Sequence, residues 1–429
     1  MTDADLLLVH AGELLTLEGG PEGEGGPRTG EALGRLGLIR DGAVAIADGI
    51  VTAVGPSADL GSVRAARTVD AQGRVVLPGF IDPHTHLLFG GSRADEFALR
   101  VRGATYLEIA AAGGGILSTV TQTRLLGERA LVDLGTARLS RMLAHGTTTV
   151  EAKSGYGLAT EEELKLLRAL HRLSAAHHVD VVPTFLGAHA VPAEFTTDPA
   201  AYVSLVIEEM LPAVAEEDLA EYCDVFCEET AFTPDQSRAI LEAGAELGLA
   251  PKIHADEFSD RGGARLAAEV GAASADHLLF AAPDGLAAMA EAGVIAVLAP
   301  GTAFFLGLPF AAARRMIDLG VPVALATDFN PGSSPTYSMQ MAIALACQGM
   351  RLTPAEAIAA ATINAAWAVG MAEEVGSLVP GKVADLVILD ATDHRVLGMT
   401  FGVNLVDEVY KRGRLVYASR GGFPEGGTR

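Results

Sequence analysis

The chain has 429 residues, of which 49% are hydrophobic, so it can bury a large core and can hold an α/β barrel with a smaller appended domain. Its 31 basic residues against 54 acidic ones give a formal net charge of −23 at pH 7, which argues against nucleic acid or an anionic membrane as a partner. Three cysteines are too few for a disulfide framework, and acidic Asp3 and Asp5 stand where a secretory signal needs basic residues, so we expect a cytoplasmic protein.

The two ends of the chain are rich in predicted strands. Short apolar runs bounded by turns predict strands at residues 6–9, 14–17, 43–47, 50–54 and 67–69, and again at 384–389, 408–411 and 414–417. Residues 19–31 are rich in Gly, Pro and Glu and are expected to form a mobile loop. Neither end has enough strands to bury a face alone, so residues 1–77 and 380–429 are predicted to pair into one small β-sandwich.

Between these ends, strand-like runs alternate with Ala- and Leu-rich helical segments such as residues 161–176 and 234–247. Eight candidate strands, with intervening helices, predict a (β/α)₈ TIM-like barrel over residues 78–379. The uncharged stretch 292–313 is divided by prolines and is interpreted as a buried strand with its loop, not as a membrane span. The candidate strands are residues 75–81, 147–152, 179–186, 223–227, 251–254, 274–279, 294–298 and 321–326.

Residues able to do chemistry gather at the ends of these predicted strands. His84 and His86 follow the first strand, and two histidines separated by one residue point to the same side of an extended segment, where they can share a metal ion. His189, His254 and His277 also lie at strand ends, where a barrel of this class carries its catalytic groups. Each histidine alone also fits a satisfied interior side chain, but five together favour a metal site.

Imidazoles together with the carboxylate of Asp328 suit zinc or ferrous iron, which lowers the pKa of a bound water and thereby favours hydrolysis. Glu257 lies three residues after His254 and can face the same pocket as a proton-transfer group, the alternative being a solvated loop position. His277 is not needed to complete four ligands and is free to move protons. Asp328 can ligate the metal and also accept a proton from the water.

Less specific signals lie in the loops after the first two strands. The guanidinium of Arg93, after the first strand, can bind a substrate carboxylate through two hydrogen bonds; the alternative is a surface ion pair. Tyr156 lies after the second strand, and the alternative for it is a packed aromatic side chain. The run Gly113-Gly114-Gly115 lacks the Lys and Ser/Thr that flank a nucleotide-binding loop, so a flexible lid is favoured over a phosphate site.

Along essentially its whole length the chain resembles the amidohydrolase superfamily, through the paired histidines on strand one, a histidine on strands five and six, the aspartate on strand eight and a sandwich built from both termini. Five segments resemble more closely the members that open an imidazolone ring during histidine degradation: residues 82–93, 153–157, 186–189, 254–257 and 327–332. The resemblance implies hydrolysis of 4-imidazolone-5-propanoate to N-formimidoyl-L-glutamate.

The resemblance also implies one zinc or iron ion (Fe²⁺ or Fe³⁺) per subunit, held by His84, His86, His254 and Asp328. Many relatives bridge two metals with a carboxylated lysine at the end of strand four, but here residues 225–228 read Val-Phe-Cys-Glu, which favours a single metal. Glu257, His277 and Asp328 would be the catalytic residues. The residues implied to bind the small-molecule substrate, with its carboxylate tail, are Arg93, Tyr156, His189, Glu257, Asn330, Gly332 and Ser333.

Two other functions remain open at this point. A different hydrolase on the same scaffold, such as a guanine or other purine deaminase, would need no cation for a carboxylate tail. A catalytically inactive scaffold protein usually lacks the metal ligands that this chain retains. Relatives with this architecture further suggest a homodimer.

Overall fold

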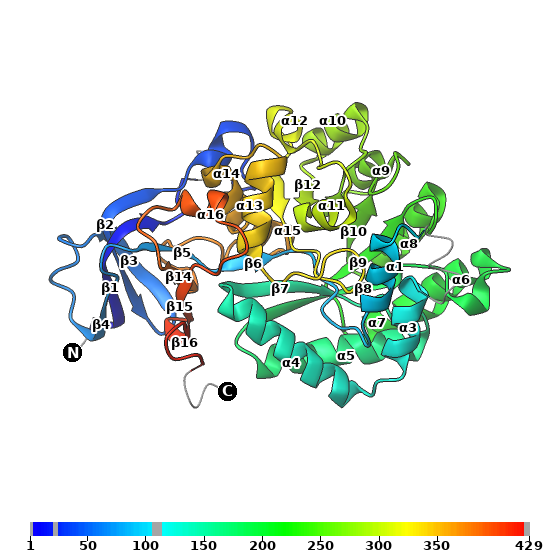
Figure 1. The fold of residues 1–429 in the computed structure, drawn as a ribbon, viewed down its shortest axis with the longest axis horizontal. Coiled ribbons are helices and arrows are strands. Elements are labelled where there is room, and N and C mark those ends of the chain that lie inside the picture. Colours follow the sequence, from blue (N-terminus) through cyan, green and yellow to red (C-terminus); the bar gives the residue numbers. More distant parts are fainter. Residues whose placement is uncertain (1–2, 20–24, 105–113, 424–429) are drawn as a thin grey trace.

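The computed structural model describes residues 3–19, 25–104 and 114–423, and the Gly- and Pro-rich residues 20–24 lie outside that description (Figure 1). Strands from both ends of the chain form one mixed sheet, which lies beside the barrel. Its order is β16-β15-β14-β5-β1-β2-β3, with β4 paired to β1. The strands are β1 (Ala4–Leu15), β2 (Leu38–Ala47), β3 (Ile50–Pro56), β4 (Ala65–Asp70), β5 (Val75–Pro78), β14 (Leu386–Leu389), β15 (Val406–Lys411) and β16 (Arg414–Ala418).

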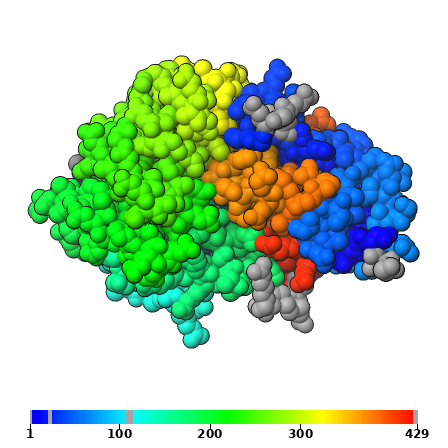
Figure 2. Space-filling view, turned by 180° about the vertical axis from the view of Figure 1, so that it is seen from behind, coloured from blue at the N-terminus to red at the C-terminus, as the bar shows by residue number. Residues whose placement is uncertain are grey.

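The terminal sheet folds over its own hydrophobic core. A bridge between Ile50 and Val383 brings the start of β3, at one edge of the sheet, against the segment that leads into the inner strand β14. Leu8, Val44 and Tyr410 share one buried cluster inside it. Figure 2 shows the N-terminal residues in blue packed against C-terminal residues in orange and red. The predicted sandwich from both termini is confirmed, although the two strands expected at 6–9 and 14–17 are one bulged strand, β1.

Eight parallel strands in chain order form the barrel, as predicted. The sheet closes where Thr85 bridges Phe329, just beyond its first and last strands. Asp82 reinforces this closure, because its carboxylate accepts hydrogen bonds from the backbone N–H (3.0 Å) and the hydroxyl (2.5 Å) of Thr327. The strands are β6 (Phe80–Asp82), β7 (Thr147–Lys153), β8 (Asp180–Ala188), β9 (Tyr222–Cys227), β10 (Ala250–Ala255), β11 (Ser274–His277), β12 (Ile295–Leu298) and β13 (Val323–Leu325).

The prediction of one continuous strand over residues 75–81 was wrong. This segment divides at Pro78-Gly79 into β5, which lies between β1 and β14, and β6, which joins the barrel beside β7. Pro78 has no N–H to continue a ladder. A Cβ on Gly79 would lie 2.2 Å from the hydroxyl oxygen of Thr148, so only glycine lets the chain cross between the two sheets here. The bounds 1–77, 78–379 and 380–429 remain a proposed division.

Helices cover the outside of the barrel (Figure 1). The predicted helix at 234–247 is α8, which begins with a capping box between Thr233 and Gln236 and has Pro234 in its first turn. Among the described residues, no helix has the length and apolar character needed to cross a membrane. The helices are α1 (Ala94–Val101), α3 (Ile116–Arg124), α4 (Glu128–Ala144), α5 (Thr160–Ala176), α6 (Pro199–Leu205), α7 (Leu211–Glu216), α8 (Pro234–Glu246), α9 (Gly263–Glu269), α10 (Pro283–Ala292), α11 (Pro300–Leu306), α12 (Ala313–Asp318), α13 (Met339–Gly349), α14 (Pro354–Ala360), α15 (Ile363–Ala368) and α16 (Val396–Met399).

Candidate active site

The candidate site lies at the carboxyl ends of the barrel strands. His84 and His86 follow β6, His189 follows β8, and His254 and His277 lie in the last two positions of β10 and β11. Asp328 follows β13, and it and the five histidines are buried. The structure therefore brings together side chains that are separated by up to 244 residues, as the strand-end argument predicted.

Three short contacts connect the four predicted metal ligands. Oδ1 of Asp328 lies 3.4 Å from Nε2 of His84 and 3.5 Å from Nε2 of His86. Nε2 of His254 lies 3.4 Å from Nε2 of His86. Four donors bound tetrahedrally at zinc distances would be about 3.3–3.6 Å apart, so this spacing fits a single ion. Nε2 of His84 and Oδ1 of Asp328 are also buried without a hydrogen-bond partner among the described residues.

Hydrogen bonds from behind orient three of these donors. Nδ1 of His84 lies 2.5 Å from Asp276, and Nδ1 of His254 lies 3.1 Å from Asp224. A neutral imidazole that donates from Nδ1 keeps the lone pair on Nε2, which is the nitrogen facing the other donors. The hydroxyl of Thr302 donates to Oδ2 of Asp328 at 2.6 Å and leaves Oδ1 free for a cation.

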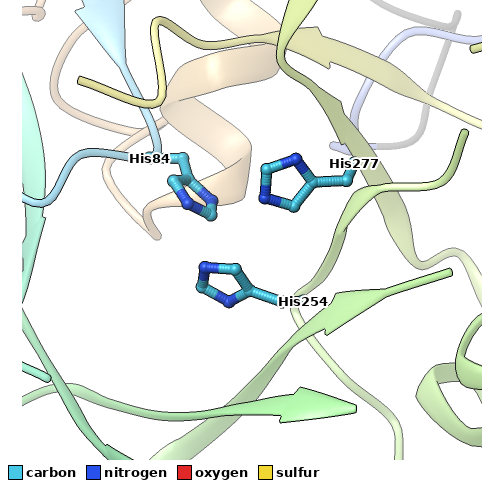
Figure 3. A group of neighbouring side chains, drawn as sticks. All are labelled: His84, His254 and His277. Atoms are coloured by element: carbon cyan, nitrogen blue, oxygen red, sulfur yellow. The ribbon is translucent and has the colours of Figure 1, made fainter. Parts of the chain in front are cut away.

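Two further histidines stand within ligand reach. Groups of donor atoms that could hold an ion include His84 with His254 and His277, and His86 with His189 and His254. In Figure 3 the rings of His84, His254 and His277 face one common space, with the ring centroid of His84 4.5 Å from that of His254 and 5.2 Å from that of His277. The ligand set His84, His86, His254 and Asp328 therefore remains a prediction, which the short donor distances support.

The surroundings of the site favour the neutral form of four of its histidines. Burial lowers the pKa of His84, His86 and His277 well below its usual value, and burial together with the neighbouring His254 lowers the pKa of His189 to about 3. The neutral form is the one that binds a metal ion. Burial also raises the pKa of Asp328 to about 6, because it disfavours the charged carboxylate. A bound cation would favour that charged form and so offset the effect of burial.

Glu257 and His277 form a pair at the edge of the donor cluster. Oε1 of Glu257 lies 3.8 Å from Nδ1 of His277. Burial, with the charges of Asp328 and Glu228 adding to it, raises the pKa of the Glu257 carboxyl well above its usual value. His277 has a φ of +76° and Asp328 a φ of +50°, conformations that side-chain-bearing residues rarely adopt and that cluster at functional sites. Both groups line the cavity, and 3.8 Å is beyond a direct hydrogen bond, so each is free to exchange a proton with a ligand there.

His86, His254 and Asp328 of the donor cluster line a cavity of about 510 Å³. All seven residues predicted to bind substrate line this cavity: Arg93, Tyr156, His189, Glu257, Asn330, Gly332 and Ser333.

The ring of His189 stacks on that of His86 with centroids 4.8 Å apart, and its Nδ1–H donates to the carbonyl of Gly155 at 3.0 Å. Nε2 of His189 is therefore an acceptor for a ligand. Gly115, from the predicted glycine lid, also lines the cavity, whereas Gly113 lies outside the described residues.

Arg93 reaches the cavity but is already engaged. Its Nε donates to Glu96 at 2.8 Å and its second terminal nitrogen pairs with the other oxygen of the same carboxylate. The remaining terminal nitrogen, Nη1, faces Gly332, where an added Cβ would lie only 2.1 Å from it. A substrate carboxylate would therefore meet Nη1 or compete with Glu96. An ion pair was the alternative that the sequence left open for Arg93, although its partner was not predicted.

Replacing Gly332 with alanine is expected to displace the Arg93 guanidinium and to raise KM roughly 10-fold with a smaller effect on kcat, because misplacing a positioning group by about 1 Å weakens substrate binding. Steady-state kinetics measure this effect. Gly127→Ala is the matched control, since no atom lies within 4 Å of the new methyl group there. Equal kinetics for the two variants would contradict the role given to Arg93.

Asn330 is used mainly inside its own loop. Its Oδ1 accepts from the backbone N–H of Gly332 (2.8 Å) and of Ser333 (2.7 Å), and its Nδ2 donates to the carbonyl of Asp328 at 2.8 Å. Asn330 thus shapes the turn that carries Gly332 and Ser333 to the cavity. Direct binding of substrate by Asn330 remains a prediction.

The sequence interpretation assigned no role to several residues of the site. Asp224 and Asp276 orient histidines, Thr302 holds Asp328, and Glu96 pairs with Arg93. Glu228 accepts the backbone N–H of Phe258 at 2.9 Å and so holds the loop that carries Glu257. One signal was available: charged residues recur at every second position within buried strands, as at 151 and 153 on β7 and at 252 and 254 on β10. That period indicates side chains facing the barrel interior.

Comparison with solved structures supports the same fold. A zinc-bound adenosine deaminase from Xanthomonas campestris superposes with a TM-score of 0.71 at 21% identity, covering 98% of this chain and 94% of that one. An E. coli guanine deaminase gives a TM-score of 0.69 at 17% identity, covering 96% and 98% of the two chains. At these identities the likeness concerns the architecture alone.

Sequence comparison identifies closer relatives. Residues 75–416 match the model of the amidohydrolase family. An imidazolonepropionase from Symbiobacterium thermophilum is 54% identical, covering 97% of this chain and 98% of its own. An imidazolonepropionase from Geobacillus kaustophilus is also 54% identical, covering 96% and 97% of the two chains. The chain therefore belongs to the amidohydrolase family and, within it, to the imidazolonepropionases.

Proposed function

We propose that this protein hydrolyses 4-imidazolone-5-propanoate to N-formimidoyl-L-glutamate, with one divalent zinc or iron ion per subunit held by His84, His86, His254 and Asp328. The observation that carries the proposal is the set of four buried donors spaced 3.4–3.5 Å from their neighbours, three of which line a cavity that Arg93 also lines. The imidazolonepropionases that share over half of its residues support this substrate.

The metal, when bound, supplies a water activated near neutral pH and polarises the carbonyl of the ring. The elements of water add across the ring amide: the carbonyl carbon gains oxygen, the C–N bond breaks, and the ring nitrogen receives a proton. Asp328 accepts the proton that leaves the water, because its carboxylate borders the donors. Glu257, whose raised pKa keeps a proton on the carboxyl, delivers one to the departing nitrogen.

His277 and the cavity residues orient the substrate. His277 stabilises the negative charge that develops on the carbonyl oxygen, from a position 3.8 Å from Glu257. Tyr156 and His189 pack against His86 with ring centroids 5.7 and 4.8 Å away, and all three line the cavity that receives the ring. Arg93, with Gly332 and Ser333, also lines the cavity and receives the propionate tail.

A direct assay tests the proposal. Purified protein, incubated with freshly prepared imidazolone propionate, should remove the ultraviolet absorbance of the ring and yield N-formimidoyl-L-glutamate. Guanine and adenosine, the substrates named in two structural neighbours, should remain unchanged. Deamination of either purine without ring opening would overturn the proposal. The homodimer and the cytoplasmic location remain predictions from sequence.

Replacing Arg93 with alanine is expected to lower kcat/KM for imidazolone propionate by about 10- to 100-fold, mainly through KM, because a hydrogen-bonded charge pair to the carboxylate tail is lost. A substrate analogue without the carboxylate should show a much smaller difference between the variant and the native protein. If both substrates lose the same factor, Arg93 does not bind the tail.

A further inference from the structure

Lys153 lies buried behind the histidines, at the end of β7, with no exposed side-chain surface. Its Nζ is 2.7 Å from Glu151, 2.7 Å from Asp224 and 3.5 Å from Asp276. An ammonium group has three N–H donors and no acceptor. Nζ donates a hydrogen bond to Glu151 and forms ion pairs with Asp224 and Asp276, so Lys153 is a cation in this position, not a ligand or a bridge between metals.

Two of these carboxylates contact the predicted ligands. Asp276 accepts from Nδ1 of His84 at 2.5 Å, and Oδ1 of Asp224 accepts from Nδ1 of His254 at 3.2 Å. One ammonium group thus connects, through two carboxylates, two histidines that belong to different strands of the barrel. The orientation of each ring depends on its carboxylate, and the position of each carboxylate depends in turn on Lys153.

Strand register explains why these groups meet. His254 is aligned with Asp276 on β11, and Asp224 on β9 is aligned with Lys252 on β10. Asp224, Lys252 and Asp276 are buried inside the barrel behind His254, which lines the cavity. Removing the Lys153 ammonium would take away the positive charge that Glu151, Asp224 and Asp276 share as an ion-pair partner, so these carboxylates would repel one another and shift.

We propose that Lys153 is a positioning residue for the metal site, which holds Asp224 and Asp276 so that His84 and His254 present Nε2 to the same ion. The inference rests on the metal site of the proposed function. It assigns Lys153 an effect on metal affinity and ligand geometry that acts only through the two carboxylates.

The test compares Lys153→Met with Lys411→Met. Lys411 is a matched control because it is also buried and pairs with two carboxylates, Asp180 and Asp385, but lies on β15 of the terminal sheet. Zinc affinity is measured by competition with a chromophoric chelator, and ligand geometry by the visible absorption of the cobalt-substituted protein. Lys153→Met should weaken zinc binding about 10- to 100-fold and change the cobalt spectrum, whereas Lys411→Met should change neither.

A double-mutant cycle with Asp276→Ala separates positioning from general destabilisation. If Lys153 acts through Asp276, the losses of zinc affinity should be less than additive in the double variant. Should Lys153→Met not fold, Asp276→Ala and Asp224→Ala carry the test, and each must lower zinc affinity. Native affinity and an unchanged cobalt spectrum in folded Lys153→Met, or native affinity in either aspartate variant, would overturn the inference. A native protein that takes up no divalent ion would instead overturn the metal site itself.

Discussion

Replacing Glu257 with glutamine is expected to lower kcat by about 10² to 10⁴ while leaving the metal content unchanged. The amide keeps the size of the side chain but cannot deliver a proton, and Glu257 is not among the four proposed ligands. Its carboxyl is buried, lies 3.8 Å from His277 and has a pKa raised well above its usual value, so it holds the proton that the departing nitrogen needs.

Turnover assays and elemental analysis of the same preparation measure the two effects separately. Glu229→Gln is the matched control, because this exposed residue lines the rim of the same cavity and should retain native turnover. Loss of metal from Glu257→Gln would move Glu257 into the ligand set. Native turnover in that variant would remove it from the mechanism.

Replacing His254 with alanine is expected to abolish stable metal binding and to lower kcat/KM by at least on the order of 10³-fold, because the reaction then loses its activated water. His254 lies at the centre of the site: its Nε2 is 3.4 Å from His86, and it belongs to two of the groups that could hold an ion. Chelator-treated native protein should regain activity on addition of zinc or iron(II), whereas His254→Ala should not.

The control for this variant is His10→Ala, which removes an exposed histidine of the terminal sheet and should leave metal content and kinetics unchanged. A His254→Ala protein that retains one tightly bound ion per chain would show that the ion is held elsewhere in the cluster. The group of His84, His86 and Asp328 would then be the first alternative.

The barrel and the placement of its chemistry could be predicted from the sequence because both follow from local patterns. Most barrel strands contain or continue a short apolar run, and a side chain at the end of such a run lies at the carboxyl end of the barrel. His84, His189, His254, His277 and Asp328 were located in this way, and the structure gathers all of them.

The connections between these residues could not be predicted in the same way. The hydrogen bond from His84 to Asp276 spans 192 residues, and no local pattern states which carboxylate will stand behind which ring. The break of residues 75–81 into β5 and β6 depends on the contact between Gly79 and Thr148, which exists only once the two sheets have formed. The pairing of Arg93 with Glu96, although local, depends on the loop conformation that precedes α1.

The most direct measurement is anomalous diffraction at the zinc and iron absorption edges from crystals of the protein purified with its native metal. The account predicts one anomalous peak per chain, within about 2.0–2.2 Å of Nε2 of His84, His86 and His254 and of Oδ1 of Asp328. A peak bound by His189 or His277 in place of these donors, two peaks bridged by a lysine, or none at full occupancy would contradict it.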